Sequence, residues 1–255
     1  MIEKVNSRDF DAVFRVMEAS FPSDEYRNRE EQRALFENPV YSVFAWKDEN
    51  ALQAFIAVWE FEKFVFVEHL AVNPPKRNGG IGAKLLREMK AVFGKRLCLE
   101  VELPETENAR RRIGFYRRNH FFLNEYPYIQ PPMSKGKNAV PLLIMTTDGA
   151  LDEKSFQEIK ETLYREVYRY EESAVGRVQR MEAFFDTVCR AMKQKSVSVE
   201  ENPAIAKMLQ ELAFYYDSGQ WLSDYERDEQ GEFPADLRRG VLSQDGLYDL
   251  LMEWR

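Results

Sequence analysis

The chain has 255 residues, of which 44% are hydrophobic and 31% are charged. This length predicts two modules, since a domain typically has about 100 to 200 residues, and the apolar content is too high for a disordered chain. The net charge of −7 excludes a generally basic nucleic-acid binder, because neutralising phosphates requires clustered, unopposed Lys and Arg.

Four further classes of protein are excluded by what the sequence lacks. Residues 1–6 do not begin a signal peptide, and no later stretch approaches the length of a membrane-spanning segment. Cys98 and Cys189 form no disulfide framework, and His69 and His120 are not in a metal-binding spacing. We therefore expect a cytoplasmic protein without metal, membrane or nucleic-acid partners.

Apolar periodicity predicts alternating strands and helices up to about residue 147. The expected strands are 2–5, 40–46, 51–61, 64–72, 96–103, 121–129 and 140–146. The expected helices are one capped by residues 7–9, then 26–36, one ending at Gly94, and 107–119. The order predicts an α/β (α+β) fold with a mixed sheet covered by helices on both faces.

After Asp148 and Gly149 the pattern becomes helical only, and the negative charge of the chain is concentrated in this part. The expected helices are 152–193, broken near Gly176, then 203–217, a short one at Trp221, and 243–254. The sequence therefore predicts two domains, 1–148 and 149–255, the second all-α.

A glycine-rich turn between a strand and a helix is the first feature that indicates chemistry. Gly79, Gly80 and Gly82 allow close backbone approach, and the helix that follows offers unpaired N–H groups and a positive dipole end to an anion such as a diphosphate. Leu85 replaces the third glycine of a dinucleotide fingerprint, and no Gly-Lys-Ser/Thr is present. The spacing alone is equally compatible with an ordinary tight turn.

The surrounding motifs resemble a known family. Leu70-Ala71-Val72-Asn73-Pro74 followed by Arg77-x-x-Gly80-x-Gly82 resembles the Arg/Gln-x-x-Gly-x-Gly/Ala motif of the GNAT (Gcn5-related N-acetyltransferase) superfamily. Leu99-Glu100-Val101, Asn108-Ala109 and the segment from Gly114 to Phe121 are similar to later GNAT elements. The resemblance covers residues 1 to about 147.

This resemblance implies transfer of an acetyl group from acetyl-CoA to an amine by direct attack in a ternary complex. The two central strands would splay apart and admit the pantetheine arm, and a backbone N–H there could polarise the thioester carbonyl. The expected cofactor-binding residues are Leu70, Ala71, Val72, Arg77, Asn78, Gly79, Gly80, Ile81, Gly82 and Asn108. Lys76, Lys84 and the run Arg110-Arg111-Arg112 are additional candidates for the phosphates, although such an arginine run is usually a solvated helix face.

Amine acetylation needs a base for the ammonium and an acid for the leaving thiolate. Tyr116 occupies the position at which GNAT members commonly have the acid; the alternative is a buried structural tyrosine. Glu100 and Glu68 are the candidate bases, although Glu100 also fits the ordinary polar face of its strand. Strand alternation puts Glu68 on the face of Phe66 and Leu70, and His69 on the other.

Two departures from the GNAT pattern affect individual residues. His120 replaces the glycine that usually precedes the phenylalanine here, which makes this turn less permissive. The segment between Glu100 and Asn108 is longer than usual, which shifts Asn108 from the position of the CoA-contacting asparagine.

The sequence predicts less about the acceptor substrate and about the second domain. Tyr126 and Tyr128 could line a pocket for a small-molecule or peptide amine, or simply belong to a proline-stiffened connection. Motifs at 215–221 and 237–243 resemble a small bacterial family of helical domains without assigned function, covering about 176–255. We expect this part to serve packing, self-association as a homodimer, or partner binding. The alternative function for the whole chain is a non-catalytic acyl-CoA-binding or protein-interaction module.

Overall fold

The structure is a computed structural model that describes residues 2–48, 51–77, 79–170, 173–193, 202–243 and 245–254. The chain forms two compact units, one of residues 1–124, 133–137 and 144–152, and one of residues 125–132, 138–143 and 153–255. The segment that contains β6 and β7 is divided between the two units. The single domain boundary after residue 148 therefore stays a prediction.

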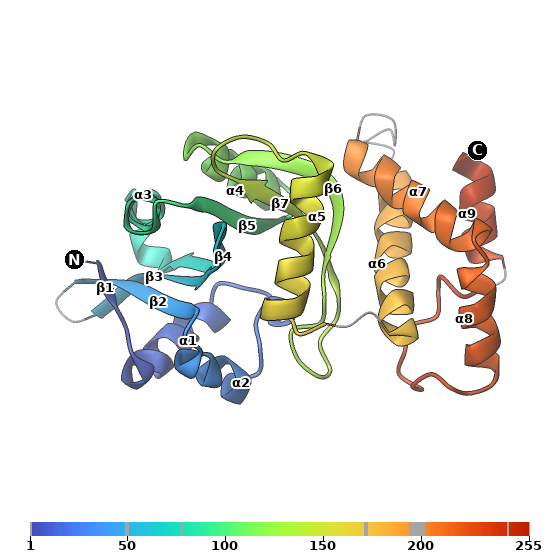
Figure 1. Cartoon of the computed structure of the whole chain (residues 1–255), viewed down its shortest axis with the longest axis horizontal. Helices are drawn as coiled ribbons and strands as arrows, with labels where there is room; N and C mark the ends of the chain where they lie inside the picture. The colour runs from blue at the N-terminus through green and yellow to red at the C-terminus, as the bar shows by residue number, and fades with distance from the viewer. Residues whose placement is uncertain are drawn as a thin grey trace. The chain divides into compact units, whose positions relative to one another are not determined.

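Strands and helices alternate up to residue 146 in the predicted order (Figure 1). The strands are β1 (Ile2–Lys4), β2 (Tyr41–Asp48), β3 (Ala51–Glu60), β4 (Phe64–Val72), β5 (Arg96–Glu102), β6 (Phe122–Gln130) and β7 (Val140–Thr146). The helices are η1 (Ser7–Asp9), α1 (Phe10–Glu18), η2 (Ser23–Glu25), α2 (Arg29–Ala34), η3 (Leu35–Glu37), η4 (Pro74–Lys76), α3 (Ile81–Phe93) and α4 (Glu107–Arg118). The predicted α/β (α+β) class is confirmed.

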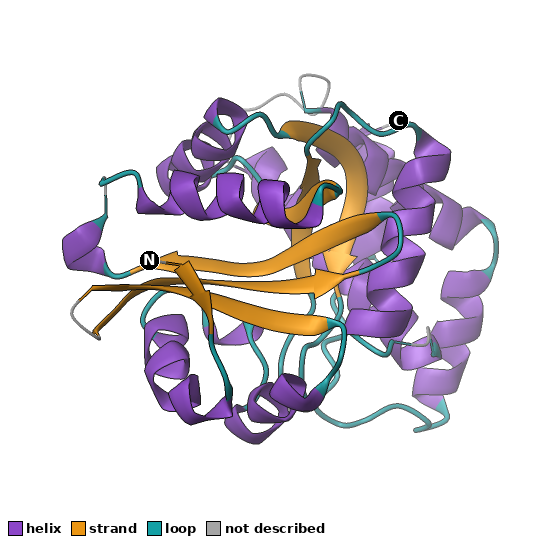
Figure 2. Cartoon of the chain, turned by 60° about the vertical axis from the view of Figure 1, so that its left-hand side comes forward, coloured by secondary structure: helices purple, strands orange, loops and turns teal. Residues whose placement is uncertain are grey.

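The strands form one seven-stranded sheet in the order β1-β2-β3-β4-β5-β7-β6. β1 to β4 pair antiparallel, whereas β4 and β5 pair parallel because α3 connects them. Helices cover both faces of the sheet (Figure 2). Apolar side chains of β3, among them Phe55 and Ile56, are fully buried in this core.

Local sequence explains where the two helices next to the motifs begin and end. α3 buries its stripe of Leu85, Leu86 and Met89 and ends at Gly94, whose φ of 62° and N–H bond to Lys90 O form a left-handed C-cap. α4 begins after Thr106, whose hydroxyl accepts a hydrogen bond from Ala109 N at 3.1 Å.

The second unit contains five α-helices within its described residues. They are α5 (Glu153–Thr162), continued by the π-helical η5 (Leu163–Val167), then α6 (Ala174–Lys193), α7 (Pro203–Asp217), α8 (Gln220–Glu229) and α9 (Gly246–Trp254). The predicted break near Gly176 is confirmed: the helix is interrupted between Val167 and Ala174, and Gly176 lies in the first turn of α6. Gly176 is needed because the Tyr170 hydroxyl fills the space that a side chain would occupy.

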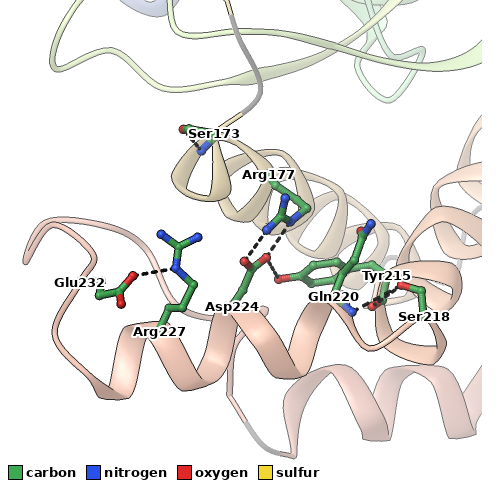
Figure 3. Close-up of polar contacts among 9 residues, drawn as sticks. Ser173, Arg177, Tyr215, Ser218, Gln220, Asp224, Arg227 and Glu232 are labelled. Carbon is green, nitrogen blue, oxygen red and sulfur yellow. Dashed lines mark hydrogen bonds and ion pairs between the residues drawn. The ribbon is translucent and has the colours of Figure 1, made fainter.

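A buried ion pair connects three of these helices (Figure 3). Asp224 of α8 is fully buried and accepts two hydrogen bonds from the Arg177 guanidinium, at 2.8 and 2.6 Å, and one from the Tyr215 hydroxyl at 2.9 Å. Each carboxylate oxygen therefore has a donor, which explains how a charge can be buried here. None of the described helices of the chain has the length and apolar character needed to cross a membrane.

Candidate active site

The central strands β4 and β5 stop pairing halfway along their length. Their parallel register ends at Val67 opposite Leu99. At the same point the register between β3 and β4 shifts: Ala57 pairs with His69 and Val58 with Val67, which leaves Glu68 as the extra residue of a β-bulge. Glu68 and Glu100 are therefore the first residues beyond the paired region on their two strands.

Beyond the bulge, β4 has backbone groups that face the β5 side without a strand partner there. Asn73 N donates to Gln53 O at 2.8 Å, and hydrogen-bonded and non-hydrogen-bonded pairs alternate in an antiparallel ladder. The N–H and C=O groups of Leu70 and Val72 consequently point away from β3. Arg77 Nε donates to Val72 O at 3.1 Å, whereas Ala71 is buried.

The glycine turn leads directly into α3. Gly80 is the N-cap with a φ of 75°, and it has no side chain that could cap the first N–H groups of the helix. A Cβ on Gly82 would lie 3.3 Å from the Phe115 ring, so Gly82 allows α3 to pack closely on α4. The N–H groups of Ile81 and Gly82 are therefore available to an anion. Of the other predicted residues of the turn, Gly79 precedes the cap and Asn78 lies outside the described residues.

Most of the basic residues predicted near the phosphates have contacts within the protein. Lys84 Nζ lies 4.3 Å from the Trp46 ring centroid, and Lys76 Nζ lies 3.9 Å from Asp48 Oδ2. Arg110 donates to two backbone carbonyls, and Arg112 forms an ion pair with Glu102 at 2.9 Å. These contacts explain Arg110 and Arg112 without a ligand.

Tyr116 lies in the last turn of α4 and is 8% exposed. Its ring packs edge-on against Phe115 and Phe121, and its hydroxyl makes no hydrogen bond in the part of the chain that the structure describes. Burial raises the pKa of Tyr116 to about 12, and the nearby positive charge of Arg112 acts in the opposite direction. The phenol is therefore protonated at neutral pH and can donate a hydrogen bond.

The two predicted bases have different environments. The Glu68 side chain is 2% exposed, and its Oε1 accepts a hydrogen bond from Arg27 at 2.6 Å. Burial alone would raise the pKa of Glu68, but Arg27 and His69 outweigh it and lower the pKa to about 2. Glu100 is half-buried at the point where β5 separates from β4.

The predicted opposite orientation of Glu68 and His69 is wrong. His69 Nδ1 lies 3.4 Å from Glu68 Oε2, and His69 Nε2 lies 2.9 Å from Glu25 O. Both side chains thus contact the segment of residues 25–27. The bulge is the reason, because an extra residue interrupts the alternation of side chains along a strand.

Three polar residues near the divergence, Arg27, Glu25 and Glu102, were not predicted from the sequence, whereas Arg112 belongs to the arginine run that was. Arg27 and Glu25 come from the segment around η2, Glu102 from β5 and Arg112 from α4. A feature that could have drawn attention to Glu25 is Pro22, which separates α1 from the following acidic turn. Nothing in the sequence indicates that Arg27 reaches Glu68, which is 41 residues away.

The remaining predicted residues lie as follows. Asn108 is exposed in the first turn of α4. His120 has a φ of 65°, so it adopts the left-handed conformation that glycine favours. Tyr128 is fully buried, and Tyr126 stacks on Phe156 at 4.6 Å between ring centroids. This packing accounts for both tyrosines without a substrate, and their role in acceptor binding stays a prediction.

Comparisons with known proteins agree with this geometry. Residues 10–121 match the "Acetyltransferase (GNAT) family", and residues 178–255 match a "Domain of unknown function (DUF4298)". A solved structure from Bacteroides thetaiotaomicron, "Putative acetyltransferase from GNAT family", is 34% identical with a TM-score of 0.60, over 67% of this chain and 99% of its own. "Putative acetyltransferase YjbC" of Bacillus subtilis (strain 168) is 26% identical over 156 residues, which are 60% of this chain and 79% of the relative.

These matches confirm the predicted two-part arrangement, with the motif-bearing part first and the helical domain of unassigned function second. The solved relative is matched over nearly its whole length and shares the fold of this chain over the matched part. The chain is an acetyltransferase and belongs to the GNAT family.

Proposed function

We propose that the protein transfers an acetyl group from acetyl-CoA to a primary amine of a small molecule or peptide, by direct attack in a ternary complex. The observation that carries this proposal is the divergence of β4 from β5 next to an uncapped helix N-terminus. An extended pantetheine arm would pair with the backbone of Leu70 and Val72 as an added strand does. The diphosphate would accept hydrogen bonds from the N–H groups that follow Gly80.

The Arg77 side chain would have a hydrogen-bond acceptor both in the free protein and with CoA bound. Its side chain now donates to Val72 O, one of the backbone acceptors that the pantetheine arm would use. On binding, the guanidinium would leave this carbonyl and turn to the phosphates, for which its planar donor set is suited. Exchanging one acceptor for another leaves no buried group unpaired.

Tyr116 would interact with the sulfur atom. As the C–S bond breaks, negative charge develops on sulfur, and a hydroxyl aimed at that position stabilises it and supplies the proton. Its neutral form persists throughout the neutral pH range because burial raises the pKa of Tyr116 to about 12. Of the two predicted bases, Glu68 is bound to Arg27, so Glu100 is the more accessible one.

Titration calorimetry with acetyl-CoA and with free CoA, followed by thiol release with amines, tests the proposal. We expect binding of both ligands, and a loss of about 10²-fold in kcat for Tyr116→Phe at unchanged CoA affinity. Phe121→Tyr, next to Tyr116 in the same aromatic cluster, controls for repacking. Equal and negligible turnover in the wild type and in Tyr116→Phe, with CoA still bound, would refute the proposal and favour a non-catalytic acyl-CoA-binding module. Absence of CoA binding would refute it and favour a protein-interaction module.

A further inference from the structure

Glu25 is positioned over the β4 bulge by its own backbone. It ends the short helix η2, and its carbonyl oxygen lies 2.9 Å from Nε2 of His69, the residue after the bulge. His69 is 2% exposed and also packs edge-on against Phe21. The η2 segment is thus attached to β4 where β4 leaves β5.

The carboxylate of Glu25 is exceptional among the acidic groups near this divergence. Within the described residues it makes no hydrogen bond and no ion pair, although it is half-buried. Its ionisable neighbours are Glu102 of β5, Arg112 of α4, His69 of β4 and Asp24 of its own segment. Arg112 is already bound to Glu102 at 2.9 Å. Glu25 therefore has a carboxylate nearby and no cation of its own.

This arrangement of charges favours the binding of a proton or another cation at the Glu25 carboxylate. Burial raises the pKa of Glu25, and Glu102 raises it further, while Arg112 and His69 lower it. A positively charged group placed beside Glu25 would relieve the repulsion between the two carboxylates.

A second, independent feature points to the same place. Tyr116 is one helical turn after Arg112 on α4, and Arg112 is close enough to affect its ionisation. The Tyr116 side chain is more than nine-tenths buried, and its hydroxyl has no partner among the described residues. Arg112 therefore affects the ionisation both of a carboxylate that can accept a proton and of a hydroxyl that can donate one.

We propose that Glu25 and Glu102 bind the acceptor amine as its ammonium ion, and that Glu25 takes the proton that must leave before the nitrogen can attack. This inference rests on the proposed function and names its substrate class: primary alkylammonium compounds without a carboxylate close to the reacting amine. A carboxylate on the acceptor would add to the negative charge of Glu25, Glu102 and Asp24.

The chemical step balances as follows. The ammonium gives one proton to Glu25, which later releases it to water. The nitrogen lone pair forms the C–N bond, and the C–S bond breaks with its electron pair remaining on sulfur. The nitrogen loses its second proton to water, sulfur takes a proton from Tyr116, and water restores the Tyr116 hydroxyl.

Thiol-release kinetics with three matched probes test the assignment: butylamine, 1,4-diaminobutane and 4-aminobutanoate, each with acetyl-CoA. We expect turnover of the two alkylamines and little or none of 4-aminobutanoate. Glu25→Gln should lose about 10²-fold in kcat with the alkylamines, with unchanged CoA affinity by calorimetry. Glu25→Asp, which keeps the charge, should recover part of this loss. Glu30→Gln, on the exposed face of α2, is the matched control and should behave as the wild type.

The pH profile separates a proton acceptor from a merely structural residue. Because the pKa of Glu25 is raised, wild-type kcat/KM should fall as the pH decreases, through a limb above the ordinary carboxyl range. This limb should be absent in Glu25→Gln and retained in Glu100→Gln. Loss of the limb in Glu100→Gln instead would identify Glu100 as the base and overturn our assignment.

The remaining outcomes distinguish this inference from the proposed function. No CoA binding by the wild type overturns both. CoA binding without acetylation of any alkylamine, equal use of 4-aminobutanoate and butylamine, or unchanged kinetics in Glu25→Gln overturns the ammonium site alone.

Discussion

Asp224 in the helical unit and Glu25 in the GNAT part are two carboxylates in sites of opposite character. Asp224 is fully buried, and Arg177 and Tyr215 donate three hydrogen bonds to it. Glu25 is half-buried and has no such donor within the described chain. A buried charge that serves only the fold needs all its partners in the protein itself, whereas one that serves a ligand leaves a position open.

Backbone groups show the same contrast. At the start of α7 the Asn202 side chain accepts hydrogen bonds from Ala204 N and Ile205 N, at 3.2 and 3.4 Å. At the start of α3 the N-cap is Gly80, which offers no acceptor. The start of α7 is thus closed by a side chain of the protein, while α3 leaves its first N–H groups to an anion. The open N–H groups of α3 belong to the glycine turn that carries the GNAT motif.

The largest effect on stability is expected at Asp224, because both of its carboxylate oxygens have hydrogen-bond donors within the protein. Asp224→Ala removes the charged acceptor that Arg177 and Tyr215 share in this buried network, which should cost about 3 to 5 kcal/mol in the free energy of unfolding. Denaturant unfolding followed by circular dichroism measures it, and Asp236→Ala, at an exposed position, is the control. A loss below 1 kcal/mol would mean that this network does not stabilise the helical unit.

The second prediction tests whether Glu68 is a carboxylate that stabilises the fold, as Asp224 is, rather than one that is left open to a ligand, as Glu25 is. Its pKa is lowered from 4.5 to about 2, so the Arg27 ion pair stabilises the fold above pH 4.5 and is lost as the pH falls toward 2. Glu68→Gln should be about 3 kcal/mol less stable than the wild type at pH 7, and the difference should shrink between pH 4.5 and 2.

Unfolding of wild type and Glu68→Gln at pH 6 and pH 3 provides the measurement. Glu62→Gln, which is exposed, should match the wild type at both values. A difference between wild type and Glu68→Gln that is independent of pH would show that Glu68 contributes by packing and not by its charge.

The polar groups that the protein leaves available to a ligand were only partly predictable from the sequence. The glycine turn, Tyr116 and the order of strands follow from local patterns, because each depends on residues close together in the chain. The bulge at Glu68 depends on the pairing of β4 with β3, and the Arg27 ion pair joins residues 41 apart in the chain; no local period encodes either contact. Glu25 was missed for the same reason, since its neighbours Glu102 and Arg112 come from β5 and α4.

The third prediction concerns the open N–H groups of α3. Gly80→Asp adds a negative charge where the diphosphate would bind, so the Kd for CoA should rise about 100-fold, equivalent to about 2.7 kcal/mol. Gly94→Asp is a matched control at the other end of the helix, because both glycines have positive φ (75° and 62°) and open space around them. Equal Kd values for the two variants by calorimetry would remove the glycine turn from the cofactor site.

The smallest effect is expected at His120, where the backbone of the GNAT part is strained. His120 has a φ of 65° in the tight turn between Tyr116 and β6, in which Phe121 N donates to Tyr116 O at 3.1 Å. A side chain in this conformation costs about 1 to 2 kcal/mol, and glycine loses about 0.4 to 1 kcal/mol through its more flexible unfolded chain. His120→Gly should therefore stabilise the protein by up to about 1 kcal/mol, seen as a higher Tm. If kcat falls while stability rises, then His120 holds Tyr116 in place, and the backbone strain at His120 serves the active site. An unchanged kcat would show that the strain is a local feature of the turn.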